Sequence, residues 1–226
     1  MGVRDEARAE TVGRILTAAR AQIAEHGGVG LSMRAVARES GLVSSAVYRY
    51  FATREALLTA MILESYEHLA AALAGVTARR PDRRWQALAR RFRDWAREHP
   101  HEFQLIYGTP IPGYVAPPET VPAAAAVAAP FLALAAHPVE TPAGAARPAA
   151  AQRPGQFGGA TLRRQLAIPA AELGVSPVVL GAVLAELAAL VGVIGLELAG
   201  HFVGTADPAD HLFEALLDRQ VHTLAL

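Results

Sequence analysis

The chain has 226 residues, of which 52% are apolar and 19% charged, and its 21 arginines balance 21 acidic residues. That length can bury the core of one large domain or two small ones. The absence of cysteine excludes a disulfide framework and a thiolate metal site, and it fits a cytoplasmic protein. The zero net charge excludes the strongly basic and strongly acidic classes. The first residues, MGVRDEARAE, are too charged for a signal peptide. No uninterrupted apolar run reaches about 18 residues, so a membrane span is not predicted.

Helical periodicity predicts four segments in the first third of the chain. Apolar residues recur at helical spacing over 11–24. A second helix is expected over Ser32–Glu39, where Ser32 is a suitable N-cap. Gly41 supplies the left-handed residue of a tight turn before a third segment, Val43–Phe51, and Thr53 can cap a fourth. Two short helices joined by a glycine-bearing turn predict a helix-turn-helix, whose second helix can enter a major groove.

The middle of the chain continues as helices separated by proline-rich breaks. Residues 84–98 have a wide apolar face opposite arginines and stop at His99-Pro100. The segment 110–118, PIPGYVAPP, cannot form a regular helix because its prolines recur every few positions. A helix is expected over 122–136, followed by a mobile loop over 137–160, which is rich in Pro, Gly and Ala.

Two helices are predicted at the end of the chain, and no segment alternates with the period of a strand. Ser176-Pro177 is a cap followed by a proline at the first helical position, and it opens a helix to about residue 201. Asp207-Pro208 repeats that signal for a last helix to about residue 224. The sequence therefore predicts an all-α fold.

The third segment carries polar residues that a purely packing helix does not need. Val47 and Phe51 are expected to face the core, which leaves two serines, a tyrosine and an arginine outside. Serine and arginine can read base edges, and tyrosine hydroxyls can reach phosphates. The predicted DNA contacts are Ser32, Arg34, Ser44, Ser45, Tyr48, Arg49, Tyr50 and Arg54. Arg34, Ser44, Ser45 and Arg49 are the candidates for base reading, and the others for phosphate contact.

The stretch LSMRAVARESGLVSSAVYRYFATREALLTAMI resembles the N-terminal DNA-binding domain of the TetR (tetracycline repressor) family of bacterial regulators. The resemblance covers residues 11–63. The family pattern has a Thr or Ser at the start of the second helix, an Ala-Gly-like turn, Tyr-x-His-Phe and then Lys-Glu. Here these are Ser32, Ser40-Gly41, Tyr48-Arg49-Tyr50-Phe51 and Arg54-Glu55, with Tyr50 in place of His and Arg54 in place of Lys.

The rest of the chain is similar to a C-terminal domain of some TetR-type regulators that is named for a Trp-His-Gly motif. The similar segments are HPHEFQLIYGTPIPGYVAPPET and GLELAGH. Only Gly192 matches the motif itself, with Leu187 and Val191 where Trp and His are expected.

These resemblances imply a DNA-binding domain over residues 1–55 and a helical ligand-sensing and dimerisation domain over 56–226. They imply a homodimer that binds a pseudo-palindromic double-stranded DNA operator, most often as a repressor released by a small apolar effector. Trp85, Phe92, Trp95, Phe103 and Tyr107 either line the effector cavity or form ordinary core, and the sequence leaves both open.

Other chemistry is expected to be absent. His99 and His101 with Glu98 and Glu102 resemble a metal cluster by type, but Pro100 removes their helical pairing, so a bend without metal is expected. The arginines over 79–97 are expected to form a solvated face with some salt bridges. No GxSxG, phosphate-loop or paired-carboxylate motif is present, so neither an enzyme nor a cofactor is predicted. The alternative is a helical small-molecule-binding protein or enzyme with a vestigial helix-turn-helix.

Overall fold

The computed structural model describes residues 2–136 and 158–226, and all regular structure in these residues is helical. The predicted all-α fold is therefore confirmed. The loop expected over 137–160 lies, up to residue 157, outside the described residues. Contacts divide the chain into two units: Met1–His68 with His99–Ala124 (unit 1), and Leu69–Glu98 with Ala125–Leu226 (unit 2). The predicted domain boundary after residue 55 falls inside unit 1.

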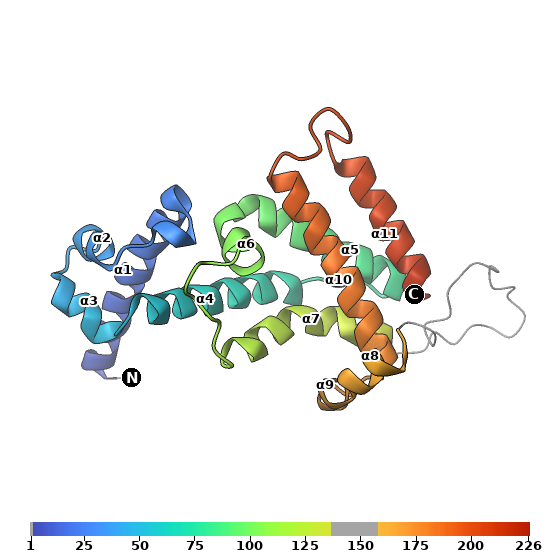
Figure 1. The fold of residues 1–226 in the computed structure, drawn as a ribbon, viewed down its shortest axis with the longest axis horizontal. Helices are drawn as coiled ribbons and strands as arrows, with labels where there is room; N and C mark the ends of the chain where they lie inside the picture. The colour runs from blue at the N-terminus through green and yellow to red at the C-terminus, as the bar shows by residue number, and fades with distance from the viewer. Residues whose placement is uncertain (1, 137–157) are drawn as a thin grey trace, which may run out of the picture. The chain divides into compact units, whose positions relative to one another are not determined.

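Unit 1 is built around three N-terminal helices, drawn in blue in Figure 1. Its elements are α1 (Val3–His26), the 3-10 helix η1 (Gly28–Gly30), α2 (Met33–Glu39), α3 (Ser44–Tyr50), most of α4 (Arg54–Ala74) and α6 (Pro100–Tyr107). Side chains from α1 to α4 form one core, in which Ile15, Val36, Val47 and Leu57 are fully buried. The two helices of the helix-turn-helix, α2 and α3, thus pack on a hydrophobic core shared with α1 and α4.

Helix α1 begins eight residues before the predicted segment. Its first two turns are exposed, so they show no apolar periodicity. They are helical because acidic residues favour the positive end of the helix dipole, and the Gly2 N–H donates to Asp5 Oδ2 at 3.2 Å. The capped start adds polar turns to a helix whose buried part agrees with the prediction.

Unit 2 contains the end of α4, α5 (Pro81–Glu98), most of α7 (Thr120–Ala136), α8 (Ala160–Gln165), α9 (Ala167–Glu172), α10 (Pro177–Leu198) and α11 (Asp210–Leu224). The predicted start of α10 is confirmed, since the Val179 N–H donates to the Ser176 hydroxyl at 3.2 Å. Helix α11 starts at Asp210, after the expected Asp207-Pro208, and its N-cap Ala209 makes no side-chain cap. Helices α8 and α9 were not predicted.

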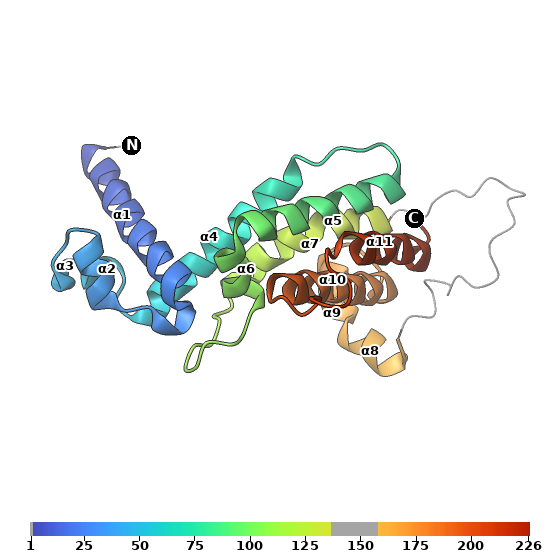
Figure 2. The ribbon, with the colours of Figure 1, turned by 90° about the horizontal axis from the view of Figure 1, so that it is seen from above.

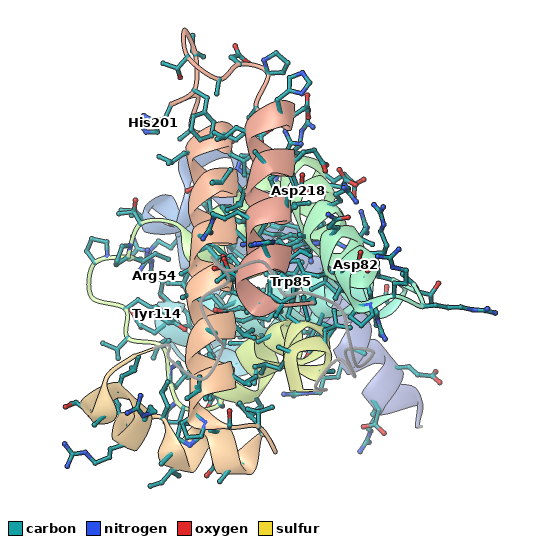
Figure 3. The ribbon with its side chains drawn as sticks, turned by 90° about the vertical axis from the view of Figure 1, so that its right-hand side faces the viewer. Arg54, Asp82, Trp85, Tyr114, His201 and Asp218 are labelled. Carbon is teal, nitrogen blue, oxygen red and sulfur yellow. The ribbon has the colours of Figure 1, made fainter. Side chains whose placement is uncertain are left out.

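Hydrogen bonds between side chains tie α5 to the C-terminal helix pair, in which α10 and α11 run side by side (Figures 2 and 3). Trp85 Nε1 donates to Gln220 Oε1 at 2.9 Å, and Gln220 Nε2 donates to the carbonyl of Glu186 at 2.7 Å. One buried glutamine therefore connects α5, α11 and α10. Gln86 adds a contact to Asp218 at 3.1 Å.

Helix α10 is long and apolar enough to cross a membrane by length and composition. In unit 2 it packs instead against α5, α8, α9 and α11. It also carries the buried Glu186, whose carboxylate accepts from Arg219 Nη2 at 2.8 Å. These contacts make α10 part of the packing of unit 2.

Candidate nucleic-acid interface

The turn between α2 and α3 is fixed by backbone and side-chain contacts within unit 1. Gly41 has a φ of +70°, the left-handed conformation expected from the sequence. The Leu42 N–H donates to the carbonyl of Ala37 at 2.9 Å, and the Ser40 hydroxyl donates back to Val36 at 2.8 Å. Arg14 of α1 donates to the carbonyl of Ser40. These bonds hold α3 at a defined angle to α2.

Ser32 positions the start of α2 through both its side chain and its backbone. Its hydroxyl accepts a long hydrogen bond of 3.5 Å from the Ala35 N–H, which confirms the predicted N-cap. Its own N–H donates to Gln22 Oε1 of α1 at 3.0 Å. Ser32 stays exposed, so a hydroxyl that caps the helix can also meet a phosphate.

Helix α3 has one buried side and one polar side. Ala46 and Val47 are buried, whereas Ser44, Ser45, Tyr48 and Arg49 are exposed. We refer to these four exposed residues as the recognition face. Val43 is 70% exposed, because it is the N-cap that precedes the helix.

Two of the predicted contact arginines are free to bind a ligand. Arg34 of α2 and Arg49 of α3 are exposed, and no other residue in the described part of the chain forms a hydrogen bond or ion pair with either. The nearby Arg38 lies only 3.9 Å from Glu39, at the edge of ion-pair distance. Guanidinium groups without an internal partner can neutralise phosphates or read guanine.

Tyr50, a predicted phosphate contact, has much of its ring in the core. It is half-buried and packs against the N-terminal core, and the guanidinium of Arg8 lies 5.2 Å from the centre of its ring. Its ring therefore links α3 to α1, which is a packing role that the phosphate assignment did not include.

Arg54, another predicted phosphate contact, binds main-chain carbonyls. Its Nε donates to the carbonyl of Leu31 at 2.9 Å, and its Nη2 donates to the carbonyls of Gly28 and Val29 at 2.7 and 3.0 Å. Arg54 (labelled in Figure 3) therefore fastens the start of α4 to the loop before α2, a structural role that was not predicted, and its contact with a phosphate stays a prediction. Periodicity could not show this, since main-chain acceptors leave no mark in the sequence.

The cap of α4 is formed as expected beside that anchor. The Ala56 N–H donates to Thr53 Oγ1 at 3.1 Å. The Glu55 backbone N–H, and then the Thr53 hydroxyl, hold the pKa of the Glu55 carboxyl below its ordinary value. The exposed carboxylate thus stabilises the helix start.

The five aromatic residues predicted around an effector are divided between the units. Trp85, Phe92 and Trp95 are fully buried in unit 2, where Trp85 meets Phe131 with ring centres 5.0 Å apart. Phe103 and Tyr107 lie in unit 1, with ring centres 5.4 Å apart, and burial raises the pKa of the Tyr107 hydroxyl. A cavity among them stays a prediction.

Five arginines of α5 and the segment before it pair with carboxylates, as predicted, but Arg93 is buried and so does not lie on a solvated face. The predicted set was Arg79, Arg80, Arg83, Arg84, Arg90, Arg91, Arg93 and Arg97. Their closest carboxylate partners include Asp82, Glu98, Glu197, Asp210 and Glu214. Because most of these cations have a carboxylate partner inside the unit, the recognition face is the better candidate for DNA.

Family profiles match both parts of the chain. The profile described as "Bacterial regulatory proteins, tetR family" matches residues 15–61, and the one described as "Tetracyclin repressor-like, C-terminal domain" matches residues 85–220. The recognition face lies within the first match.

Curated relatives and solved structures are similar to the chain. HTH-type transcriptional regulators Mb1846 of Mycobacterium bovis and Rv1816 of Mycobacterium tuberculosis are each 41% identical over 123 residues. That alignment covers 53% of this chain and 53% of each relative, so the chain spans about half the length of the curated relatives it matches. The crystal structure of the regulatory protein SCO4313 is 28% identical with a TM-score of 0.77, covering 97% of this chain and 99% of that one. The fatty acid degradation regulator FadR of Bacillus halodurans, at 14% identity and a TM-score of 0.54, shares the fold over 95% of this chain and 99% of its own.

Proposed function

Because the chain belongs to the tetR family of bacterial regulatory proteins, we propose that it is a DNA-binding transcription regulator that acts as a repressor. The observation that carries this proposal is the recognition face on α3. It is polar, exposed and held by a capped and glycine-turned helix pair. Such a face suits the major groove of a duplex, whereas a vestigial helix-turn-helix does not need it.

The proposed contacts follow from side-chain chemistry. Ser44 and Ser45 are short residues at the start of α3, so they allow the backbone to approach base edges. Arg49, one turn further, can read guanine through paired donors. Tyr48 would contact a phosphate and so set the position of α3 in the groove, and Arg34 of α2 would reach a base edge beside it.

We propose that the protein acts as a homodimer through α10 and α11. Only 39% of the most apolar stretch of α10 is buried within the chain. Leu184, Leu196 and Leu212 of this helix pair are 44%, 45% and 38% exposed. A symmetry-related copy would cover these leucines and create a four-helix interface. Two-fold symmetry then requires a pseudo-palindromic operator with half-sites about 34 Å apart or slightly more.

The proposed effector is a small apolar molecule bound by the helices of the region 56–226. To release DNA, it must favour the non-binding conformation through a difference in affinity of about 1–3 kcal/mol. The long helix α4 supports this route, since it starts next to the recognition helix and has residues in both units. A regulator of this kind acts where the chromosome is, in the cytoplasm.

The test is selection of operator sequences from a pool of random duplexes with purified protein, followed by affinity measurements. Enrichment of an inverted repeat is the expected result. No enrichment, with retained binding of small molecules, would instead support the alternative of a vestigial helix-turn-helix.

Variants then locate the contact surface. Arg49→Ala should weaken operator binding by about 1–3 kcal/mol, and Tyr48→Phe should weaken it less, while the oligomeric state stays unchanged. Arg79→Ala, which removes an exposed arginine of unit 2, is the matched control and should bind normally. Equal affinity of Arg49→Ala and Arg79→Ala would contradict the assigned face.

A further inference from the structure

Two histidines and a glutamate from distant parts of the sequence meet within unit 1. His68 lies near the end of α4, whereas His99 and Glu102 lie at the start of α6. His68 Nδ1 is 3.3 and 3.1 Å from the two oxygens of Glu102, which is 34 residues away in sequence. His99 Nδ1 is 3.4 Å from Glu102 Oε1. Both imidazoles thus direct the same ring nitrogen at one carboxylate.

These separations match the edges of a tetrahedral metal site. Zn²⁺ binds imidazole nitrogen and carboxylate oxygen at about 2.0–2.2 Å, so ligand atoms around a tetrahedral ion lie roughly 3.3–3.5 Å apart. With Glu102 Oε1 as the ligand atom, His68 Nδ1 lies 3.3 Å and His99 Nδ1 lies 3.4 Å away, both close to that value. One ligand atom from each of the three residues lies within 4.8 Å of the other two. Small side-chain rotations would therefore bring all three onto one ion.

The surroundings favour a cation and leave room for it. An open hollow of about 500 Å³ is lined by the three residues together with Arg20, Glu64 and Glu67. Arg20 pairs with Glu64 at 2.7 Å, so its positive charge is neutralised. Glu67 and Glu102 leave the hollow with an excess of negative charge, and water can occupy a fourth position on the ion.

We propose that His68, His99 and Glu102 bind a divalent transition-metal ion such as Zn²⁺. Two imidazoles with one carboxylate suit zinc and its first-row neighbours, whereas Ca²⁺ and Mg²⁺ require mostly oxygen ligands. Sequence reasoning expected no metal because it considered His99 and His101 across Pro100. His101 lies in a different hollow, beside Gln104 and Ile111, and the second imidazole comes from α4. An ion at this site joins α4 to α6 inside the unit that carries the recognition face.

The test uses the full chain, freed of any affinity tag and stripped of metal with a chelator. Titration calorimetry with Zn²⁺ should show one ion bound per chain. Co²⁺ should give the visible absorption of tetrahedral coordination and lose it when Zn²⁺ is added. Failure of the unaltered protein to bind one ion, or a Co²⁺ spectrum without tetrahedral features, would overturn the proposal.

Variants assign the ligands. We expect Zn²⁺ binding to weaken by at least about 10–100-fold in each of His68→Ala, His99→Ala and Glu102→Gln. Losses of that size follow even when only a residue that hydrogen-bonds to a metal ligand is replaced. His101→Ala is the control and should keep the affinity of the unaltered protein. Undiminished binding in both His68→Ala and His99→Ala would refute the assignment. If a variant does not fold, NMR of the unaltered protein decides: Co²⁺ should broaden the ring signals of His68 and His99 before those of His222, and the reverse order would reject the site.

Discussion

Replacing Arg93 with methionine should markedly destabilise unit 2. Arg93 lies on α5 and is only 8% exposed. Its Nε and Nη2 donate to the two oxygens of Glu197 at 2.7 Å each, and its Nη1 donates to Asp210 at 2.8 Å. The guanidinium also lies 4.7 Å from the ring centre of Phe213. Methionine keeps much of the apolar stem and removes the charge and the hydrogen bonds.

The magnitude follows from the charges that the substitution leaves behind. Removing one partner of a buried ion pair costs about 3–5 kcal/mol, because the remaining charge has no compensation. The side chain of Glu197 is 16% exposed and that of Asp210 is 56% exposed, so water can partly replace the lost contacts. We therefore expect the lower end, a loss of about 3 kcal/mol in the free energy of unfolding. For a chain of this size, that loss lowers Tm by about 6–12 °C.

Thermal unfolding followed by circular dichroism, at one fixed protein concentration, measures this effect. Arg97→Met, which changes an exposed arginine one turn along α5, is the control and should alter stability by no more than about 0.5 kcal/mol. Adding Glu197→Gln to Arg93→Met removes the uncompensated carboxylate and should restore part of the stability. The reasoning fails if Arg93→Met unfolds at the same temperature as Arg97→Met, or if the double variant is no more stable than Arg93→Met alone.

Three further outcomes can be tested by unfolding and binding. Hydrogen bonding from Arg90 holds the pKa of Glu214 below its ordinary value of 4.5. The stabilisation from this pair is therefore present above pH 4.5 and declines as pH falls through the lowered pKa. Urea unfolding between pH 3 and 6 should show a flatter acid dependence of stability in Arg90→Met, and an identical pH profile would argue against the pair. Gly41→Ala forces a side chain into a φ of +70°, so we expect a loss of about 1–2 kcal/mol in urea unfolding, and no loss would contradict the strained turn. Arg54→Met should cost at least about 2 kcal/mol of stability and weaken operator binding without changing the salt dependence; a slope reduced by about one would instead place Arg54 on a phosphate.

The helix-turn-helix and the start of α10 could be predicted because local signals determine them. Ser32 and Ser176 are caps whose hydroxyls serve the helix that directly follows. Gly41 marks a turn that only a residue tolerant of positive φ adopts without strain. Val47, between exposed neighbours, marks the buried side of α3. Each signal acts within a few residues, so the sequence alone reveals it.

The features that escaped prediction depend on long-range or main-chain contacts. Arg54 binds carbonyl oxygens 23 to 26 residues earlier, and every residue type offers such an acceptor. His68 and Glu102 are 34 residues apart, with the end of α4 and all of α5 between them, so no local pattern shows that they meet. The polar start of α1 and the short helices α8 and α9 lack a strong apolar stripe, so periodicity did not detect them.

The anchoring of α4 through main-chain oxygens has a consequence for protein engineering. Arg54 donates hydrogen bonds to the main-chain carbonyls of Gly28, Val29 and Leu31. These bonds do not depend on the polar side chains of α2 and α3. The exposed residues of α2 and α3 can therefore be exchanged for those of a relative without breaking the hydrogen bonds of Arg54. We expect the helix pair to serve as a scaffold for engineering a different DNA specificity.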